Sequence, residues 1–188
     1  MTENTRRVVV TGLGLVSPVG STVNKAWDNI KNGVSGIRKI SSFDASSFSV
    51  QIAGSVVDFN AEEYITPKDQ KKMDTFIHYG IGASAMAIKD AGLEINDENR
   101  DRIGISIGSG IGGLPYIERN YGNFLEKGPR KISPYFVPSS IINMVSGNLS
   151  IMYGITGPNM SLVSACATGT HSIGDAARLI KHGYVDCM

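Results

Sequence analysis

The sequence predicts an α/β fold in layers around a mostly parallel sheet. Short segments rich in β-branched residues alternate with longer segments whose apolar residues recur at helical spacing. Glycine follows several of the apolar segments, as expected where a buried strand turns toward the next helix. Since 41% of the 188 residues are hydrophobic, the chain can bury a substantial core. No repeat or linker divides residues 1–188, so their length fits either one ordinary domain or one large domain cut short.

The first third of the chain is expected to begin with a strand and a short helix. Residues 7–15 are β-branched and include two glycines near the end, a pattern typical of a buried parallel strand before a tight turn. Thr22 can cap the helix that follows, and Gly33 can end it. The serine-rich stretch after this helix contains one expected strand, at 50–57.

Helices and strands continue to alternate through the rest of the chain. A long amphipathic helix is expected from Pro67 to Gly92, because its apolar residues are spaced to form one stripe. Residues 102–108 alternate like a strand and lead into a glycine-rich loop. The remaining expected elements are helices at 114–125, 139–152 and 168–182, an extended connector at 127–138, and short strands at 161–164 and 184–188.

Charge and cysteine content exclude several classes of function. Eighteen Lys and Arg against 17 Asp and Glu give a net charge of +1, which provides no global field for nucleic acid or membrane binding. Two cysteines without a CxxC or Cys/His cluster offer neither a disulfide framework nor a set of metal ligands, and we expect no cofactor. Without a signal-peptide pattern or a membrane-length apolar segment, the sequence predicts a soluble cytoplasmic protein.

Cys166 lies between a predicted strand and a predicted helix, among small residues. A thiol in the first turn of a helix faces unpaired N–H groups and the positive end of the helix dipole, which favours the thiolate. Ala165, Ala167 and Gly169 leave room for a thioester to approach, and a backbone N–H at such a turn can stabilise an oxyanion. A cysteine between small residues is more often an inert packing residue, so the spacing on its own yields a candidate nucleophile.

The segment Ser-Ala-Cys-Ala-Thr-Gly-Thr-His-Ser-Ile-Gly around Cys166 resembles the active-site signature of elongating β-ketoacyl-acyl-carrier-protein synthases. The resemblance extends over the chain through Val-Val-Val-Thr-Gly-Leu-Gly, Gln-Lys-Lys-Met-Asp, Ile-Gly-Ser-Gly-Ile-Gly-Gly and Arg-Lys-Ile-Ser-Pro-Tyr-Phe-Val-Pro-Ser, in that order. It implies a thiolase-like fold, normally built from two related halves. Residues 1–188 would be the amino-terminal half and part of the remainder, truncated inside the strand expected at 184–188.

The resemblance also implies a reaction. In that family the cysteine accepts an acyl group from the phosphopantetheine thioester of acyl carrier protein. Malonyl-carrier protein then loses carbon dioxide, and the resulting carbanion attacks the acyl-enzyme during fatty-acid chain elongation. By this resemblance Cys166 is the nucleophile, and Ile111 and Phe136 belong to the acyl pocket. Phe136 also marks where the pocket meets the partner subunit of a homodimer, and Lys68 and Lys71 dock the acidic carrier protein.

Each of these assignments has a plainer alternative, and one part of the family's machinery is missing. Ile111 and Phe136 can be ordinary packing residues, and lysines at a helix start are usually only solvated. The family's decarboxylation uses two histidines and a lysine from its second half, which this sequence does not contain. We therefore expect the isolated chain to be unable to condense, although Cys166 can still be acylated slowly. The sequence indicates no role for Cys187.

Three rival functions compete with this interpretation. Residues 108–113 fit the G-x-G-x-x-G pattern of a dinucleotide-binding loop, but no strand ending in an acidic residue follows at the required distance. A cysteine hydrolase would need a histidine close to Cys166. His171 points off the cysteine's helix face, His182 lies at the far end of that helix, and His78 remains open. A non-catalytic fragment that binds carrier protein or a full-length subunit is the third possibility.

Overall fold

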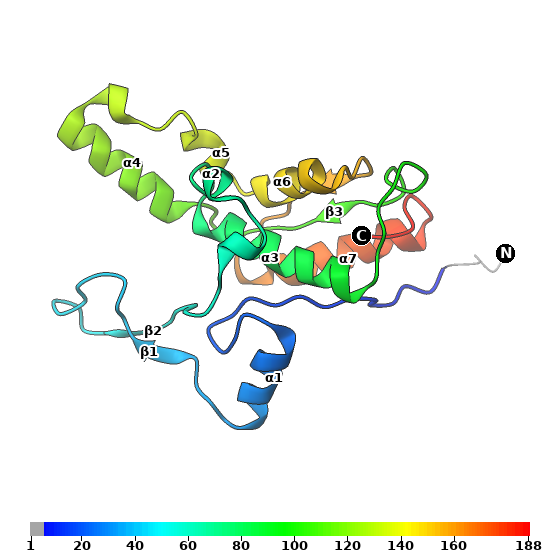
Figure 1. The fold of residues 1–188 in the computed structure, drawn as a ribbon, viewed down its shortest axis with the longest axis horizontal. Coiled ribbons are helices and arrows are strands. Elements are labelled where there is room, and N and C mark those ends of the chain that lie inside the picture. The colour runs from blue at the N-terminus through cyan, green and yellow to red at the C-terminus, as the bar shows by residue number, and fades with distance from the viewer. Residues whose placement is uncertain (1–5) are drawn as a thin grey trace.

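The computed structural model describes residues 6–188 as a mixed α/β fold (Figure 1). Its helices and strands are α1 (Val23–Lys31), β1 (Ile37–Lys39), β2 (Ile52–Gly54), α2 (Pro67–Gln70), α3 (Thr75–Asp90), β3 (Ile105–Ser106), α4 (Leu114–Lys127), α5 (Phe136–Ser140), α6 (Met144–Tyr153), β4 (Asn159–Met160) and α7 (Thr168–Lys181). Three short 3-10 helices are η1 (Ala61–Glu63), η2 (Pro129–Lys131) and η3 (Ala165–Ala167). In the part of the chain from residue 6 onward, no helix is long and apolar enough to cross a membrane.

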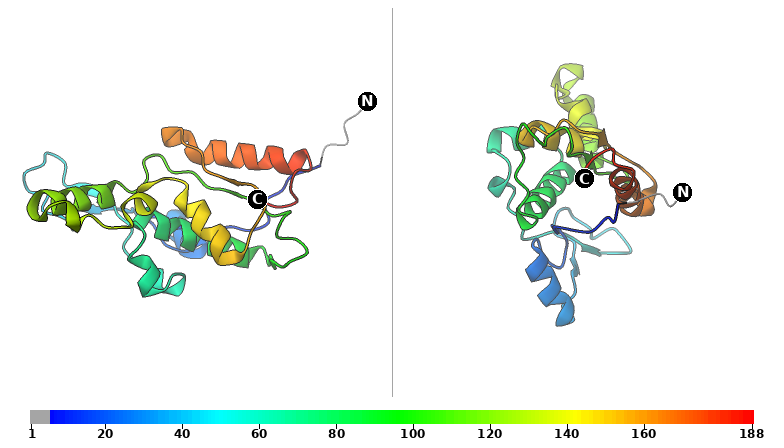
Figure 2. Two further views of the ribbon diagram at one scale, coloured as in Figure 1. Left: turned by 90° about the horizontal axis from the view of Figure 1, so that it is seen from above. Right: turned by 90° about the vertical axis from the view of Figure 1, so that its right-hand side faces the viewer.

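The strand β3 lies between two layers of helices. Figure 2 shows α7 on one side of β3, with α3 and α6 packed against each other on the other side. The core cluster lies in this second layer and joins buried isoleucines of α3 and β3 to Val145 and Leu149 of α6. In Figure 1, α4 extends away from these layers, and α1 lies with the β1–β2 hairpin at the opposite side. The α/β part of the predicted fold class is therefore confirmed.

The sheets are smaller than predicted. Strands β3 and β4 pair in parallel, with Ile105 opposite Asn159, while β1 and β2 form a separate antiparallel hairpin. The strand expected at 161–164 lies two residues earlier, and the segment expected to form the last strand contributes one parallel bridge, between Ile103 and Cys187. Parallel pairing is therefore present, but the described residues do not assemble a large parallel sheet.

The predicted strand at residues 7–15 is wrong. The segment pairs with no strand among the described residues, and Val9 and Val10 are 58% and 79% exposed. It runs instead along α3, where a Cβ on Gly14 would lie 1.8 Å from the carbonyl oxygen of Ala83. The Leu13 N–H also donates to the Asp90 carboxylate at 2.9 Å. An extended apolar pattern indicates strand conformation, but it cannot supply the neighbouring strand that pairing needs.

The long helix predicted from Pro67 to Gly92 is two helices. Residues 71–74 interrupt it, and Asp74 has an extended backbone with a φ of −78° and a ψ of 161°. Its carboxylate caps α3 through the Phe76 N–H. Helix α2 ends at Gln70 with Lys71 as its C-cap, and Asp74 is the N-cap that begins α3. The apolar stripe begins only at Met73, inside the break, and residues 68–72 are all polar. The start signal at Pro67, and not the periodicity, therefore led to the prediction of one helix.

Three of the other predicted helices agree with the structure. The segment after α7 is joined by hydrogen bonds to Arg102, just before β3. Helices α1, α4 and α7 cover the predicted ranges. The predicted helix at 139–152 corresponds mainly to α6, and the connector predicted at 127–138 is not extended throughout, because it contains η2 and the start of α5. After α7, the Arg102 guanidinium donates to both carboxylate oxygens of Asp186 at 3.0 Å and to the carbonyl oxygens of Gly183 and Tyr184. These bonds, together with Arg6, hold the pKa of Asp186 well below its usual range.

Candidate active site

Cys166 occupies a strained turn between β4 and α7. It is the middle residue of η3, and its side chain is exposed. The residue before it, Ala165, has a φ of 50° and is the one non-glycine residue with positive φ in residues 6–188. The left-handed conformation costs an alanine about 1–2 kcal/mol, so the surroundings must hold it in place. Backbone strain of this kind clusters at functional sites, where it aims a reactive side chain.

Hydrogen bonds hold both sides of this turn. The Thr168 hydroxyl accepts the Ser164 N–H at 2.9 Å and donates to the Ala165 carbonyl oxygen at 2.7 Å. The Ser164 carbonyl oxygen accepts the Ala167 N–H at 3.1 Å. The Ser164 hydroxyl and the His171 Nδ1 share a further hydrogen bond of 2.7 Å. The main chain on either side of Cys166 is therefore tied to the first turn of α7.

The first turn of α7 provides a favourable field for negative charge. Its N-cap residue, Ala167, offers no side-chain hydrogen bond, and no acidic residue lies in the first turn. The positive end of the helix dipole is therefore not neutralised by a side chain. A tetrahedral intermediate that forms on Cys166 would carry its oxyanion close to this end, where preorganised N–H groups stabilise developing charge.

The glycine-rich loop after β3 packs directly on the cysteine turn. A Cβ on Gly108 would lie 2.2 Å from the Leu162 carbonyl oxygen and 2.4 Å from the Thr168 Cγ2 atom. A Cβ on Gly110 would lie 3.5 Å from the Ala165 carbonyl oxygen. Gly108 is thus required for close approach of two backbone segments. The motif that resembles a phosphate-binding loop here serves to support Cys166.

The far end of the same loop is anchored by the buried carboxylate of Asp74. Asp74 is 2% exposed and accepts the Tyr116 N–H, in the first turn of α4, at 2.7 Å. In a dinucleotide-binding domain the pyrophosphate takes this position at the helix N-terminus. A buried carboxylate already fills it, so a second anion would be repelled. The geometry therefore excludes the dinucleotide-binding alternative for this loop.

The structure places the other predicted site residues in two parts of the fold, around the glycine-rich loop and at α2. Ile111 lies beside Gly110 in the loop and is 73% exposed. Phe136 begins α5 and is partly buried, and α5 contacts the end of the loop where the Gly113 N–H donates to the Ser140 carbonyl oxygen at 2.9 Å. Lys68 and Lys71 are exposed on α2 and at its C-cap.

Two of the three histidines form hydrogen bonds with groups other than the Cys166 thiol. His171 pairs with Ser164, while the His78 Nε2 lies 3.2 Å from the Gln70 carbonyl oxygen. Burial lowers the pKa of His78, which favours its neutral form at pH 7. His182 is exposed at the C-cap of α7. Neither His78 nor His171 therefore has the arrangement of a hydrolase base. Among residues 6–188, no group of three or more possible metal ligands occurs.

Three supporting residues were not predicted from the sequence. Asp74, Ser164 and Thr168 position the site without belonging to its chemistry. A capping signal could have identified Asp74, because aspartate directly precedes the Thr75 start of α3. The roles of Ser164 and Thr168 depend on the left-handed backbone at Ala165, and an alanine gives no sequence signal for that conformation.

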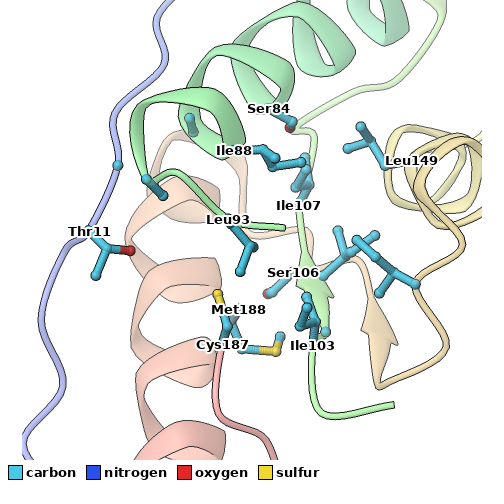
Figure 3. A pocket seen from close by; sticks show the side chains of 16 residues that line it. Thr11, Ser84, Ile88, Leu93, Ile103, Ser106, Ile107, Leu149, Cys187 and Met188 are labelled. Atoms are coloured by element: carbon cyan, nitrogen blue, oxygen red, sulfur yellow. The ribbon is translucent and has the colours of Figure 1, made fainter. Parts of the chain in front are cut away.

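The second cysteine lies in a different environment. Cys187 and Met188 line an apolar groove of about 220 Å³ between the N-terminal segment, α3 and β3 (Figure 3). Leu93 and Ile103 face the same space in the close-up view. Burial raises the pKa of the Cys187 thiol, so this residue is a less reactive internal reference for Cys166.

We predict that Gly108→Ala destabilises the protein, because the added methyl group would collide with the backbone at Leu162. The expected loss in free energy of unfolding is about 1–3 kcal/mol, as for other overpacked sites. Gly122→Ala is the matched control: it lies in α4 with nothing within 4 Å of the added Cβ, and we expect a gain of up to about 1 kcal/mol. Urea unfolding measures both, and equal stability of the two variants would contradict the packing described here.

Comparison with known proteins shows the family. Residues 5–188 match the family described as "Beta-ketoacyl synthase, N-terminal domain". Among curated proteins, 3-oxoacyl-[acyl-carrier-protein] synthase 2 of Vibrio cholerae is 55% identical over 97% of this chain and 44% of its own length. The protein of the same name from Staphylococcus aureus N315 is 47% identical over 100% of this chain and 45% of its own. The chain thus spans about half the length of these relatives.

Solved structures agree with this result. The ishigamide ketosynthase/chain length factor is 28% identical and superposes with a TM-score of 0.85 over 96% of this chain and 45% of its own. A type II polyketide ketosynthase in complex with its acyl-carrier protein is 27% identical, with a TM-score of 0.78 over 96% of this chain and 49% of its own. The chain belongs to the β-ketoacyl synthase family, whose N-terminal domain it matches over residues 5–188.

Proposed function

We propose that this chain carries the acyl-transfer site of a 3-oxoacyl-[acyl-carrier-protein] synthase, with Cys166 as the nucleophile. The observation that carries the proposal is the strained turn at Ala165, which presents an exposed thiol beside the uncapped N-terminus of α7. The names of the curated relatives indicate the same activity. The proposal concerns the first half-reaction, in which Cys166 takes the acyl group from the carrier-protein thioester.

The proposed step is a thioester exchange. The Cys166 Sγ gives up its proton and attacks the thioester carbonyl carbon of an acyl group carried on phosphopantetheine. The C–S bond to the carrier then breaks, and the departing thiolate takes up a proton, so that one thioester replaces another. The oxyanion of the intermediate would be stabilised near the first turn of α7. Decarboxylative condensation with malonyl-carrier protein would follow in fatty-acid chain elongation.

We propose that Ile111 and Phe136 line the path of the acyl chain. Ile111 is exposed in the loop that packs on the cysteine turn, and burying it against an alkyl chain would remove apolar surface from water. Phe136 lies at the other end of the same loop, where α5 begins. The proposal places this end at the contact with a second subunit of a homodimer. We also propose that the protein needs no cofactor and acts in the cytoplasm.

We propose that Lys68 and Lys71 bind an acidic carrier protein. Neighbouring Lys72 is held by Asp69 at 2.6 Å, whereas neither Lys68 nor Lys71 forms an ion pair with any of residues 6–188. Both side chains are exposed on the same short segment. Two free ammonium groups close together attract an acidic partner and steer its approach. One of the solved ketosynthases is itself in complex with its acyl-carrier protein.

We predict that incubation with an acyl-carrier-protein thioester adds one acyl mass to Cys166. Intact-mass and peptide mass spectrometry would locate the adduct, and Cys166→Ala should abolish it. Cys187 should remain unmodified in the same sample because its thiol is half-buried. A folded protein that gains no adduct, or gains it on Cys187, would contradict the proposal and favour a role in binding alone.

A charge reversal tests the docking proposal separately. The double variant Lys68→Glu and Lys71→Glu should raise the carrier-protein concentration needed for half-maximal acylation by about tenfold at low salt, with a smaller effect at high salt. The matched control, Lys39→Glu with Lys89→Glu, changes the net charge equally at two other exposed positions. If both double variants weaken acylation to the same extent, the effect is one of net charge and the docking site is wrong.

A further inference from the structure

We propose that Thr168 is a positioning residue for Cys166, and that the Ser164–His171 hydrogen bond assists it. Together they hold the left-handed turn at Ala165 that presents the thiol. The inference rests on the proposed role of Cys166 as nucleophile. It adds a structural cause for the reactivity of the thiol in residues that do not themselves touch the acyl group.

The Thr168 hydroxyl joins the two residues that precede the cysteine. Thr168 is 6% exposed, and its one hydroxyl group accepts the Ser164 N–H at 2.9 Å while donating to the Ala165 carbonyl oxygen at 2.7 Å. The Ser164 N–H belongs to the peptide group before Ser164, and the Ala165 carbonyl oxygen belongs to the peptide group between Ala165 and Cys166. A single hydroxyl oxygen therefore holds the peptide groups at both ends of the two-residue segment that contains the turn.

The loss of this hydroxyl would release the strain at Ala165. Without its partner the Ser164 N–H loses its hydrogen bond, and the alanine can return to negative φ, which it prefers. That rotation moves the peptide group between Ala165 and Cys166 and displaces the thiol relative to α7. Because the field of a helix dipole falls off within one turn, even a small displacement lowers the stabilisation of negative charge on sulfur.

His171, one helical turn further along α7, forms a second hydrogen bond to Ser164. Its Nδ1 lies 2.7 Å from the Ser164 hydroxyl, and the imidazole is exposed. Ser164 is thus held through its N–H by Thr168 and through its side chain by His171. Because His171 is on the surface, replacing it should leave the fold intact and remove one of the two hydrogen bonds that hold Ser164.

The surroundings of Thr168 allow its hydroxyl to be tested apart from its methyl group. The Cγ2 atom lies 2.4 Å from the position that a Cβ on Gly108 would take, so the methyl group packs against the glycine loop. Thr168→Val keeps this contact and removes the hydroxyl. Thr168→Ser keeps the hydroxyl and removes the methyl group. Thr170→Val provides a matched control two residues along, at an exposed position where the threonine side chain forms no hydrogen bond within the described part of the chain.

The experiment measures iodoacetamide alkylation of Cys166 and Cys187 in the purified protein by peptide mass spectrometry. In Thr168→Val we expect the Cys166 rate to fall about tenfold, as for loss of a buried hydrogen bond, with the Cys187 rate unchanged. Thr168→Ser and Thr170→Val should stay within about twofold of the parent for both cysteines. His171→Leu should slow Cys166 about threefold, which tests the inference even if Thr168→Val does not fold.

An unchanged Cys166 rate in folded Thr168→Val, or an equal loss in Thr168→Ser, would overturn the inference. So would an unchanged rate in His171→Leu if Thr168→Val does not fold. Alkylation needs neither carrier protein nor acyl group, so the two proposals can fail separately. A protein that is alkylated as predicted but is never acylated contradicts the proposed function alone. A protein that is acylated, but whose alkylation does not depend on Thr168 or His171, contradicts the positioning role alone.

Discussion

The buried carboxylate of Asp74 is the interaction on which the arrangement of the site depends. At 2% exposure it accepts the N–H groups of Phe76 and Tyr116, at the starts of α3 and α4. A buried carboxylate is costly unless hydrogen bonds compensate it, and two helix N-termini provide both the donors and a favourable field. This one side chain therefore fixes α4, and with it the end of the glycine-rich loop, relative to the core helix α3.

The loop transmits this constraint to the nucleophile. From its anchored end near Asp74 it returns to β3 through Gly108, which permits backbone contact with the segment leading into Cys166. The strained Ala165 is then trapped between the loop and α7, and Thr168 closes the turn with hydrogen bonds. Close-packed interiors transmit small displacements because few voids exist to absorb them. The reactivity proposed for Cys166 therefore depends on four chain segments: the start of α3 at Asp74, the glycine-rich loop, the segment leading into Cys166, and α7.

The local parts of this arrangement could be predicted from the sequence, and the long-range parts could not. Amphipathic periodicity and capping residues identified α1, α4 and α7, and small residues around Cys166 indicated a strand-to-helix turn. Periodicity could not reveal the break at Asp74, because the apolar stripe begins only at Met73 and carries no information on residues 68–72. The segment 7–15 has the composition of a strand but pairs with none among the described residues. The positions proposed for Ile111, Phe136, Lys68 and Lys71 came from family resemblance, since their spacing carries no chemical signal.

Hydrogen exchange at the Tyr116 amide would show whether Asp74 holds the glycine-rich loop to α3. If the Asp74 carboxylate holds this N–H in the buried junction, the amide should exchange as slowly as that of Ile81 in the core of α3. The exchange of both amides would then report the same large opening of the fold. An amide at Tyr116 that exchanges as fast as that of exposed Gly110 would contradict the account, because the loop would then move independently of α3 and could not hold the cysteine turn in place.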